Sequence, residues 1–132
     1  MIVAPGTGPA LVRSTGSAPG RWQCLARRGM LFSECESVEH WDLPLGAVIP
    51  VEAAHGVEEA VVVLTGALTA TIDGATVHAS AGTCLFIPAG SDGILCAGTD
   101  RTRLLSVRCL PAQIAARLPV RIPELRPAAA PT

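Results

Sequence analysis

The stretch GAVIPVEAAHGVEEAVVVLTG (residues 46–66) and the stretch GTCLFIPAGSDGILCA (residues 82–97) decide the fold of this sequence. Glycines stand at both ends of the first stretch and at the start of the second. In and around these stretches, short runs suited to strands alternate with turns at the spacing expected of a β-sandwich or barrel. The sequence therefore predicts an all-β fold.

The clearest local signal is the dipeptide Asp73-Gly74, which separates strand-like runs at 68–72 and 75–79. Asp-Gly supplies the positive φ angles of a two-residue turn, so we expect a hairpin here. A short helix is expected within 111–118, and the proline-rich residues after it cannot continue a helix. Further strands are expected at 22–28, 30–41, 83–87, 94–97 and 103–109.

The spacing of the two glycine-framed stretches resembles the two sequence motifs of the cupin family. Six residues separate Glu59 from Gly66, and Gly82, Pro88 and Gly90 stand at the spacing of the second motif. The resemblance implies a single cupin-type β-barrel, or jelly roll, with a short C-terminal helix or tail. It also implies a cavity in which, in a typical cupin, three histidines and one glutamate hold a metal ion.

This chain departs from the cupin pattern at the metal ligands. Gly93 stands where the second motif has histidine, and Ala97 stands where it has asparagine. In the first motif the histidine positions depend on the count: five residues separate Gly46 from Glu52, whereas three residues separate His55 from Glu59.

These two counts predict opposite orientations for Glu52 and His55, because side chains alternate between the faces of a strand. One count turns Glu52 inward and the other turns His55 inward. A bulge or the end of the strand lets both reach the cavity. Either count leaves the matched positions with two ligands, one of them Glu59.

Two protein ligands are normally too few for zinc or iron, which need at least three donors of defined geometry. We therefore expect either no cofactor or a divalent metal with an unusual ligand set, including His55 and Glu59. The candidates for a third ligand are Glu52 and His55 acting together, His78, Cys84 and Cys96.

A metal-free site is also consistent with these residues. A carboxylate near an imidazole orients the ring and favours its protonated form, and neighbouring groups of this kind suit proton transfer near neutral pH. The sequence predicts His55 as a general base, with Glu59 orienting it or acting as the acid, and Glu52 as a third catalytic candidate.

A small-molecule pocket is expected inside the barrel. Because large side chains are scarce there, we expect it to be apolar and roomy, and to bind an apolar small molecule rather than a sugar or a phosphate. The residues expected to line it are Trp41, Val61, Val63, Phe86 and Leu95.

Composition excludes several other classes of protein. The chain has 132 residues, a net charge of −1 and no lysine or tyrosine, and its arginines are not clustered. Length fits one domain, the charge pattern argues against nucleic-acid binding, and Schiff-base chemistry on a lysine is excluded. The five cysteines have no disulfide or zinc-ribbon spacing, and no apolar run is long enough to span a membrane. We expect a cytoplasmic protein.

The chain divides into an N-terminal arm (1–21), the barrel (22–110) and a C-terminal helix with a proline-rich tail (111–132). The Gly- and Pro-rich composition of residues 4–20 favours an irregular arm. Because cupins commonly pair through edge strands and exchange N-terminal segments, the resemblance implies a homodimer.

Three functions are consistent with the sequence. The first is a small cupin enzyme acting on a small, largely apolar organic substrate by acid/base chemistry, as an isomerase, cyclase, lyase or dehydratase in specialised metabolism. The second is a cupin that binds or senses a small molecule without catalysis. The third, implied by the family, is a metal-dependent oxygenase with a non-standard ligand set.

Overall fold

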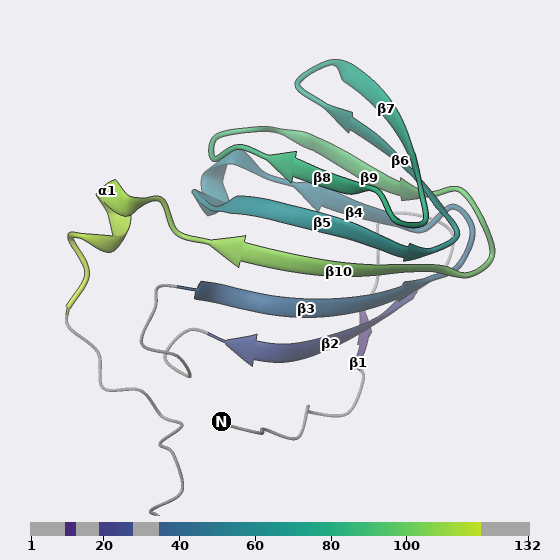
Figure 1. Ribbon diagram of the computed structural model, residues 1–132, viewed down its shortest axis with the longest axis horizontal. Helices are drawn as coiled ribbons and strands as arrows, with labels where there is room; N and C mark the ends of the chain where they lie inside the picture. The colour runs from purple at the N-terminus through teal and green to yellow at the C-terminus, as the bar shows by residue number, and fades with distance from the viewer. Residues whose placement is uncertain (1–9, 13–18, 28–34, 120–132) are drawn as a thin grey trace, which may run out of the picture.

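The computed structural model describes residues 10–12, 19–27 and 35–119, which form strands, a 3-10 helix and one short α-helix (Figure 1). In chain order the elements are β1 (Ala10–Val12), β2 (Gly20–Arg27), β3 (Cys35–Leu43), β4 (Val48–Val51), η1 (Ala53–His55), β5 (Glu58–Thr65), β6 (Ala67–Ile72), β7 (Ala75–Ser80), β8 (Cys84–Ile87), β9 (Gly93–Ala97), β10 (Thr102–Cys109) and α1 (Ala112–Ala115).

The strands form two antiparallel sheets packed face to face (Figure 1). The larger sheet has the order β1-β2-β3-β10-β5-β8, and the smaller has the order β4-β9-β6-β7. Crossovers between the sheets, as from β9 to β10, join them into one barrel-like body. The all-β barrel that the glycine-framed stretches predicted is confirmed.

The core fills the space between the inner faces of the sheets. Alternate residues of facing strands point inward, as Val61 and Val63 do on β5 and Leu95 does on β9. Burying such a side chain contributes about 1.5–3 kcal/mol. The core consists of Leu43, Ala47, Val61, Val63, Leu68, Ala70, Ala79, Ile87, Leu95, Ala97 and Leu104.

The hairpin predicted at Asp73-Gly74 is confirmed and joins β6 to β7. Asp73 has φ 49° and Gly74 has φ 81°, the positive angles that a two-residue hairpin turn needs. Asp73 Oδ1 accepts a hydrogen bond of 2.9 Å from the backbone N–H of Asp92. This contact ties the hairpin to the loop between β8 and β9 and lowers the pKa of the Asp73 carboxyl.

Gly66, which closes the first stretch, is required by a close approach of the backbone. Its φ is 79°, and a Cβ at this position would lie 2.7 Å from the carbonyl oxygen of Arg101. A side chain would therefore be both strained and blocked. This glycine lets the chain turn sharply from β5 in the larger sheet to β6 in the smaller one.

Two expectations at the ends of the barrel differ from the structure. Residues 10–12 lie within the predicted irregular arm, yet they form β1, which pairs with Gly20–Trp22 of β2. Part of the predicted strand 30–41, residues 30–34, lies outside the described residues. The remainder of that strand is β3, which extends two residues further, to Leu43.

The predicted C-terminal helix is present but short. α1 begins after Pro111, and Ile114 lies over Gly56, close enough that a Cβ on Gly56 would be 3.6 Å from Ile114 Cδ1. α1 therefore packs beside the loop that follows η1. Neither helix in the described part of the chain has the length and apolar character of a transmembrane helix.

Candidate functional site

A row of polar side chains crosses the inner face of the larger sheet at one end. In the strand register Arg108 of β10 stands opposite Ser37 of β3 and Glu59 of β5, and Ser106 stands opposite Glu39. Residues paired in this way lie on the same face of a sheet, so these five side chains share the inner face with the buried core. Polar residues on a core-facing surface need partners, and several of these side chains are partners of one another.

Glu39 is buried, with 8% of its surface exposed, and three side chains compensate its carboxylate. Ser37 Oγ donates to Oε1 at 2.8 Å, and Trp41 Nε1 donates to Oε2 at 3.2 Å. Arg108 Nη1 lies 3.8 Å from Oε1. A buried carboxylate is costly unless it is paired and hydrogen-bonded, and Glu39 is both.

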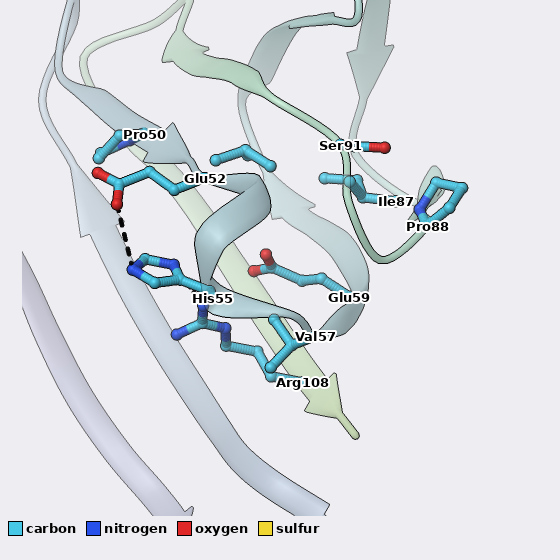
Figure 2. Close-up of a pocket in the computed structure, with 10 residues that line it drawn as sticks. Pro50, Glu52, His55, Val57, Glu59, Ile87, Pro88, Ser91 and Arg108 are labelled. Atoms are coloured by element: carbon cyan, nitrogen blue, oxygen red, sulfur yellow. Dashed lines mark hydrogen bonds and ion pairs between the residues drawn. The ribbon is translucent and has the colours of Figure 1, made fainter. Parts of the chain in front are cut away.

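Glu59 has one oxygen held and one free. Ser106 Oγ donates to Oε1 at 2.5 Å. Within the described part of the chain, Oε2 has no hydrogen-bond partner, so it is available to a bound molecule. Glu59 lines a cavity of about 10 Å³, space for roughly one water molecule (Figure 2). The cavity is lined by Pro50, Val51, Glu52, His55, Val57, Glu59, Ile87, Pro88, Ser91 and Arg108.

Glu52 and His55 reach the mouth of this cavity together, because β4 ends at Val51 and η1 follows (Figure 2). Their side chains are 54% and 47% exposed, and Glu52 Oε2 lies 3.3 Å from His55 Nε2. Of the arrangements left open by the sequence, the structure shows the one in which the strand's end lets both residues approach the cavity.

Both ring nitrogens of His55 have a partner. Arg108 Nη2 lies 3.1 Å from His55 Nδ1, and a guanidinium can only donate. On the other side of the ring, Nε2 faces Glu52. The role of His55 as a general base stays a prediction from the sequence.

The residues present do not fit a divalent metal site. Among the described residues, no three His, Cys, Asp or Glu side chains are grouped as such a site requires. At Gly93, where the family has a ligand, a Cβ would lie 2.1 Å from the carbonyl oxygen of Thr71 and 2.9 Å from Ile72 Cα. No side chain fits there on this backbone. The Arg108 guanidinium beside His55 would also repel a cation.

The other candidates for a third ligand lie away from Glu59. His78 is exposed on β7 and its Nδ1 lies 3.0 Å from Thr69 Oγ1, on the outer face of the smaller sheet. Cys84 is exposed on β8, and Cys96 pairs with Thr69 on the same outer face as His78. The structure does not bring these side chains together.

The residues expected to line one pocket do not lie around a common space. Val61, Val63 and Leu95 point inward, with at most 1% exposure, but they belong to the packed core. Trp41 also points inward and packs on Trp22, with ring centroids 6.5 Å apart. These side chains therefore belong to the packed core or lie against it.

The inward orientation expected for Phe86 is wrong. Glu59 pairs with Ile87 and Val61 pairs with Leu85, so these two residues of β8 face inward. Phe86 lies between them and is 80% exposed. The expected single roomy apolar cavity inside the barrel is wrong as well. The cavity that Glu59 shares with Arg108 is small, and a larger apolar hollow of about 350 Å³ beside Glu59 is lined by outward-facing residues such as Phe86 and Val107.

A separate apolar slot opens between β7 and β8, the edge strands at which the two sheets do not join. Its volume is about 140 Å³. Val77 pairs with Ala70 on the inward face of the β6–β7 hairpin. It is nevertheless 49% exposed, because it borders this slot. The slot is lined by Ala70, Ile72, Ala75, Val77, Leu85, Phe86 and Ile87, so Ile87 contacts both the slot and the polar cavity.

The sequence analysis did not identify Glu39, Ser106 or Arg108. The available signal was alternation: in β10 the residues Thr102, Leu104, Ser106 and Arg108 lie on one face. Only the pairing with β3 and β5 shows that this face is inside and that the polar residues meet there.

Comparisons with known proteins agree with the fold described above. A family model described as a cupin domain matches residues 39–107, more than half of the chain. No curated protein matches the chain significantly. Among solved structures, a predicted oxalate decarboxylase from Thermotoga maritima has 20% identity and a TM-score of 0.67, covering 78% of this chain and 92% of that one.

Two further structures show how widely the fold is used. KdgF from Halomonas sp. has 13% identity and a TM-score of 0.59, covering 73% of this chain and 84% of that one. The cupin domain of an XRE family transcriptional regulator from Enterobacter cloacae has 18% identity and a TM-score of 0.61, covering 70% and 97%. At these identities the likenesses establish the fold alone.

Proposed function

Since this chain belongs to the cupin family, we propose that it is a small cupin enzyme acting on a small, largely apolar organic molecule by acid/base chemistry. The reaction class is that of an isomerase, cyclase or lyase. One observation carries this proposal: Glu59 lines the cavity with one carboxylate oxygen held by Ser106, and its other oxygen has no hydrogen-bond partner among the described residues. A positioned carboxylate with a free oxygen is suited to take and return a proton.

Glu59 replaces His55 as the proposed base. Ser106 fixes the plane of the Glu59 carboxylate, because its hydroxyl donates to Oε1. His55, bridged between Glu52 and Arg108, acts as a positioning residue at the mouth of the cavity. The small volume of the cavity limits the number of water molecules that can compete for the free oxygen of Glu59.

The apolar slot supports the apolar character of the substrate. It shares Ile87 with the polar cavity, so the two spaces meet at this one side chain. A molecule of modest size would then place its carbon skeleton among apolar side chains and its reacting group beside Glu59.

Non-catalytic binding is the second candidate, and the same slot favours it. No residue that lines the slot is titratable, so a ligand lying only there would be bound without reaction. A metal-dependent oxygenase is not favoured, because Gly93 leaves no space for a ligand and no three donors are grouped among the described residues.

Deuterium labelling distinguishes catalysis from binding. The protein would be incubated in heavy water with a small-molecule extract, and mass spectrometry would follow deuterium incorporation and consumption of metabolites. We expect incorporation with the parent and with Glu58→Gln, whose side chain is exposed, and a loss of about 100-fold or more with Glu59→Gln. Equal incorporation by the two variants would overturn the proposal, whereas retention of a metabolite without incorporation would favour the binding module.

A further inference from the structure

Arg108 carries a buried donor that the described residues leave unused. Its Nη2 contacts His55 and its Nη1 faces Glu39, but its Nε is buried and has no hydrogen-bond partner among the described residues. Buried polar groups are nearly always paired, and leaving a donor unpaired costs free energy. An unpaired donor on a side chain that lines a small cavity points to an acceptor that a bound molecule would bring.

The chemistry of this acceptor follows from the groups that share the cavity. Arg108 lines the same cavity as Glu59, and the two residues are direct cross-strand partners. The cavity, at about 10 Å³, has room for one oxygen-sized group. A single oxygen held beside a permanent cation and next to a carboxylate base is the arrangement needed to enolise a carbonyl compound.

We propose that Arg108 binds the carbonyl oxygen of an enolisable ketone and stabilises the enolate formed when Glu59 removes the adjacent proton. In this step the C–H bond breaks and its proton moves to Glu59 Oε2. The electron pair of that bond forms a C=C bond, and the carbonyl π pair moves to the oxygen beside Arg108. Where the ketone carries a C=C bond next to the deprotonated carbon, the enolate extends over that bond, and return of the proton from Glu59 to the far end of it completes an isomerisation with no other reactant.

The charges of the site favour a neutral ketone over a carboxylate or phosphate. The carboxylate of Glu39 already balances the guanidinium of Arg108, and Glu59 adds one negative charge. Proton transfer from a neutral ketone moves that charge from Glu59 to the substrate oxygen, so the total charge does not change. An anionic substrate would instead add a second charge next to Glu59, which is unfavourable in a poorly solvated site.

In a typical cupin a metal ion would carry the positive charge at this site. Here the guanidinium of Arg108 carries it. The guanidinium is a fixed cation at any physiological pH, and its orientation is set from two sides, by His55 and by Glu39. This inference rests on the proposed acid/base function, but its test has a separate readout.

Binding of 2-naphthol tests the oxygen site without turnover. The naphtholate oxygen resembles an enolate oxygen, and the emission of naphtholate differs from that of neutral naphthol. We expect the parent to bind 2-naphthol and Arg108→Lys to bind it about tenfold or more weakly, because lysine keeps the charge but lacks the Nε donor. Glu59→Gln should bind the naphtholate more tightly than the parent, since the neighbouring negative charge is gone.

Two controls keep the result interpretable. Arg103→Met removes an exposed arginine from the same strand and should leave naphthol binding unchanged. Arg108→Lys retains a cation beside Glu39, so it should fold, which circular dichroism and thermal melting would verify. Failure of the parent to bind 2-naphthol, or equal affinity of Arg108→Lys and the parent, overturns the oxygen site.

Exchange of the α-protons of 2-tetralone in heavy water, followed by NMR, connects the site to the reaction. Exchange that is lost in both Glu59→Gln and Arg108→Lys supports both proposals. Exchange lost only in Glu59→Gln would leave the acid/base function standing and refute the role of Arg108. Naphthol binding that depends on Arg108, with no exchange of 2-tetralone or incorporation into extract metabolites, would refute the acid/base function and retain an oxygen-binding site.

Discussion

The strands β3, β10 and β5 have inner faces of opposite character at their two ends. At one end Leu43, Leu104 and Val63 are almost completely buried in the core. At the other end the same strands present Glu39, Arg108 and Glu59, and the last two line a small cavity. The sheet thus has an apolar half that packs in the core and a polar half that borders the cavity.

Removing a side chain from the apolar half should have the largest effect on stability. Leu104→Ala deletes a side chain that is 1% exposed, and we expect the free energy of unfolding to fall by about 3–4 kcal/mol, because a cavity is left in the core. Leu64→Ala, 43% exposed on β5, is the matched control and should cost less than about 1 kcal/mol. Urea denaturation measures both. A small effect of Leu104→Ala would contradict the assignment of the apolar half.

Breaking the polar half should cost less. Glu39→Ala leaves Arg108 without its carboxylate and removes the acceptor of Ser37 and Trp41, so we expect a loss of about 2–3 kcal/mol in the free energy of unfolding. The double variant Glu39→Gln with Arg108→Met should return to within about 1 kcal/mol of the parent, since no unpaired charge remains. It should still fail to bind 2-naphthol. Restored binding in this variant would show that the pair serves stability alone.

Filling the space at Gly93 should have an intermediate effect. Gly93→Ala places a Cβ against the carbonyl of Thr71 on the neighbouring strand, and we expect about 1–2 kcal/mol of destabilisation from this overlap. Gly98→Ala is the control, because its nearest contact would be an ordinary 3.4 Å from Ala67 O. Thermal melting compares the two. Equal melting temperatures would mean that β6 and β9 separate easily.

Replacing an outward side chain on β8 should change stability least. Phe86→Ser removes a phenyl ring that is 80% exposed, so we expect a change within about 0.5 kcal/mol in the free energy of unfolding. Ile87→Ser, on the inner face, is the contrasting variant and should destabilise clearly. A large loss for Phe86→Ser in the monomer would contradict its outward orientation.

Thiol labelling distinguishes inner from outer positions without changing stability. Burial, together with Cys109 and Glu36, raises the pKa of the Cys35 thiol. Less of the reactive thiolate is then present at neutral pH, so iodoacetamide should modify Cys35 more slowly than the exposed Cys84. The rate at Cys35 should rise as the pH is raised toward its pKa. Peptide mass spectrometry measures both sites, and faster labelling of Cys35 would contradict the prediction.

Features that depend on neighbouring residues could be predicted from the sequence. The hairpin at Asp73-Gly74 follows from two residues that accept positive φ, and the glycine-framed stretches resemble motifs of one family. The orientation of Phe86 could not be predicted in this way, because Cys84–Ile87 is a run of four apolar residues and shows no alternation between two faces. The inner face became visible only through the pairing of Glu59 with Ile87.

The site depended on information that is not local. Glu39 and Glu59 lie far in the sequence from Ser106 and Arg108, and the four meet only because β3 and β5 flank β10 in a particular register. The positions of Glu52 and His55 depended on where β4 ends, which the spacing of residues 46–59 did not determine. The homodimer and the cytoplasmic location stay predictions.

The tight packing at Gly93 also bears on how this protein can change over generations. A histidine arriving at this position would meet the backbone of Thr71 and Ile72 before it reached any metal. The spacing of β6 and β9 would have to widen first, a change that brings no ligand and weakens a sheet. A metal ligand at this position therefore needs a change in the backbone as well as the histidine itself, so a single substitution is not expected to produce one.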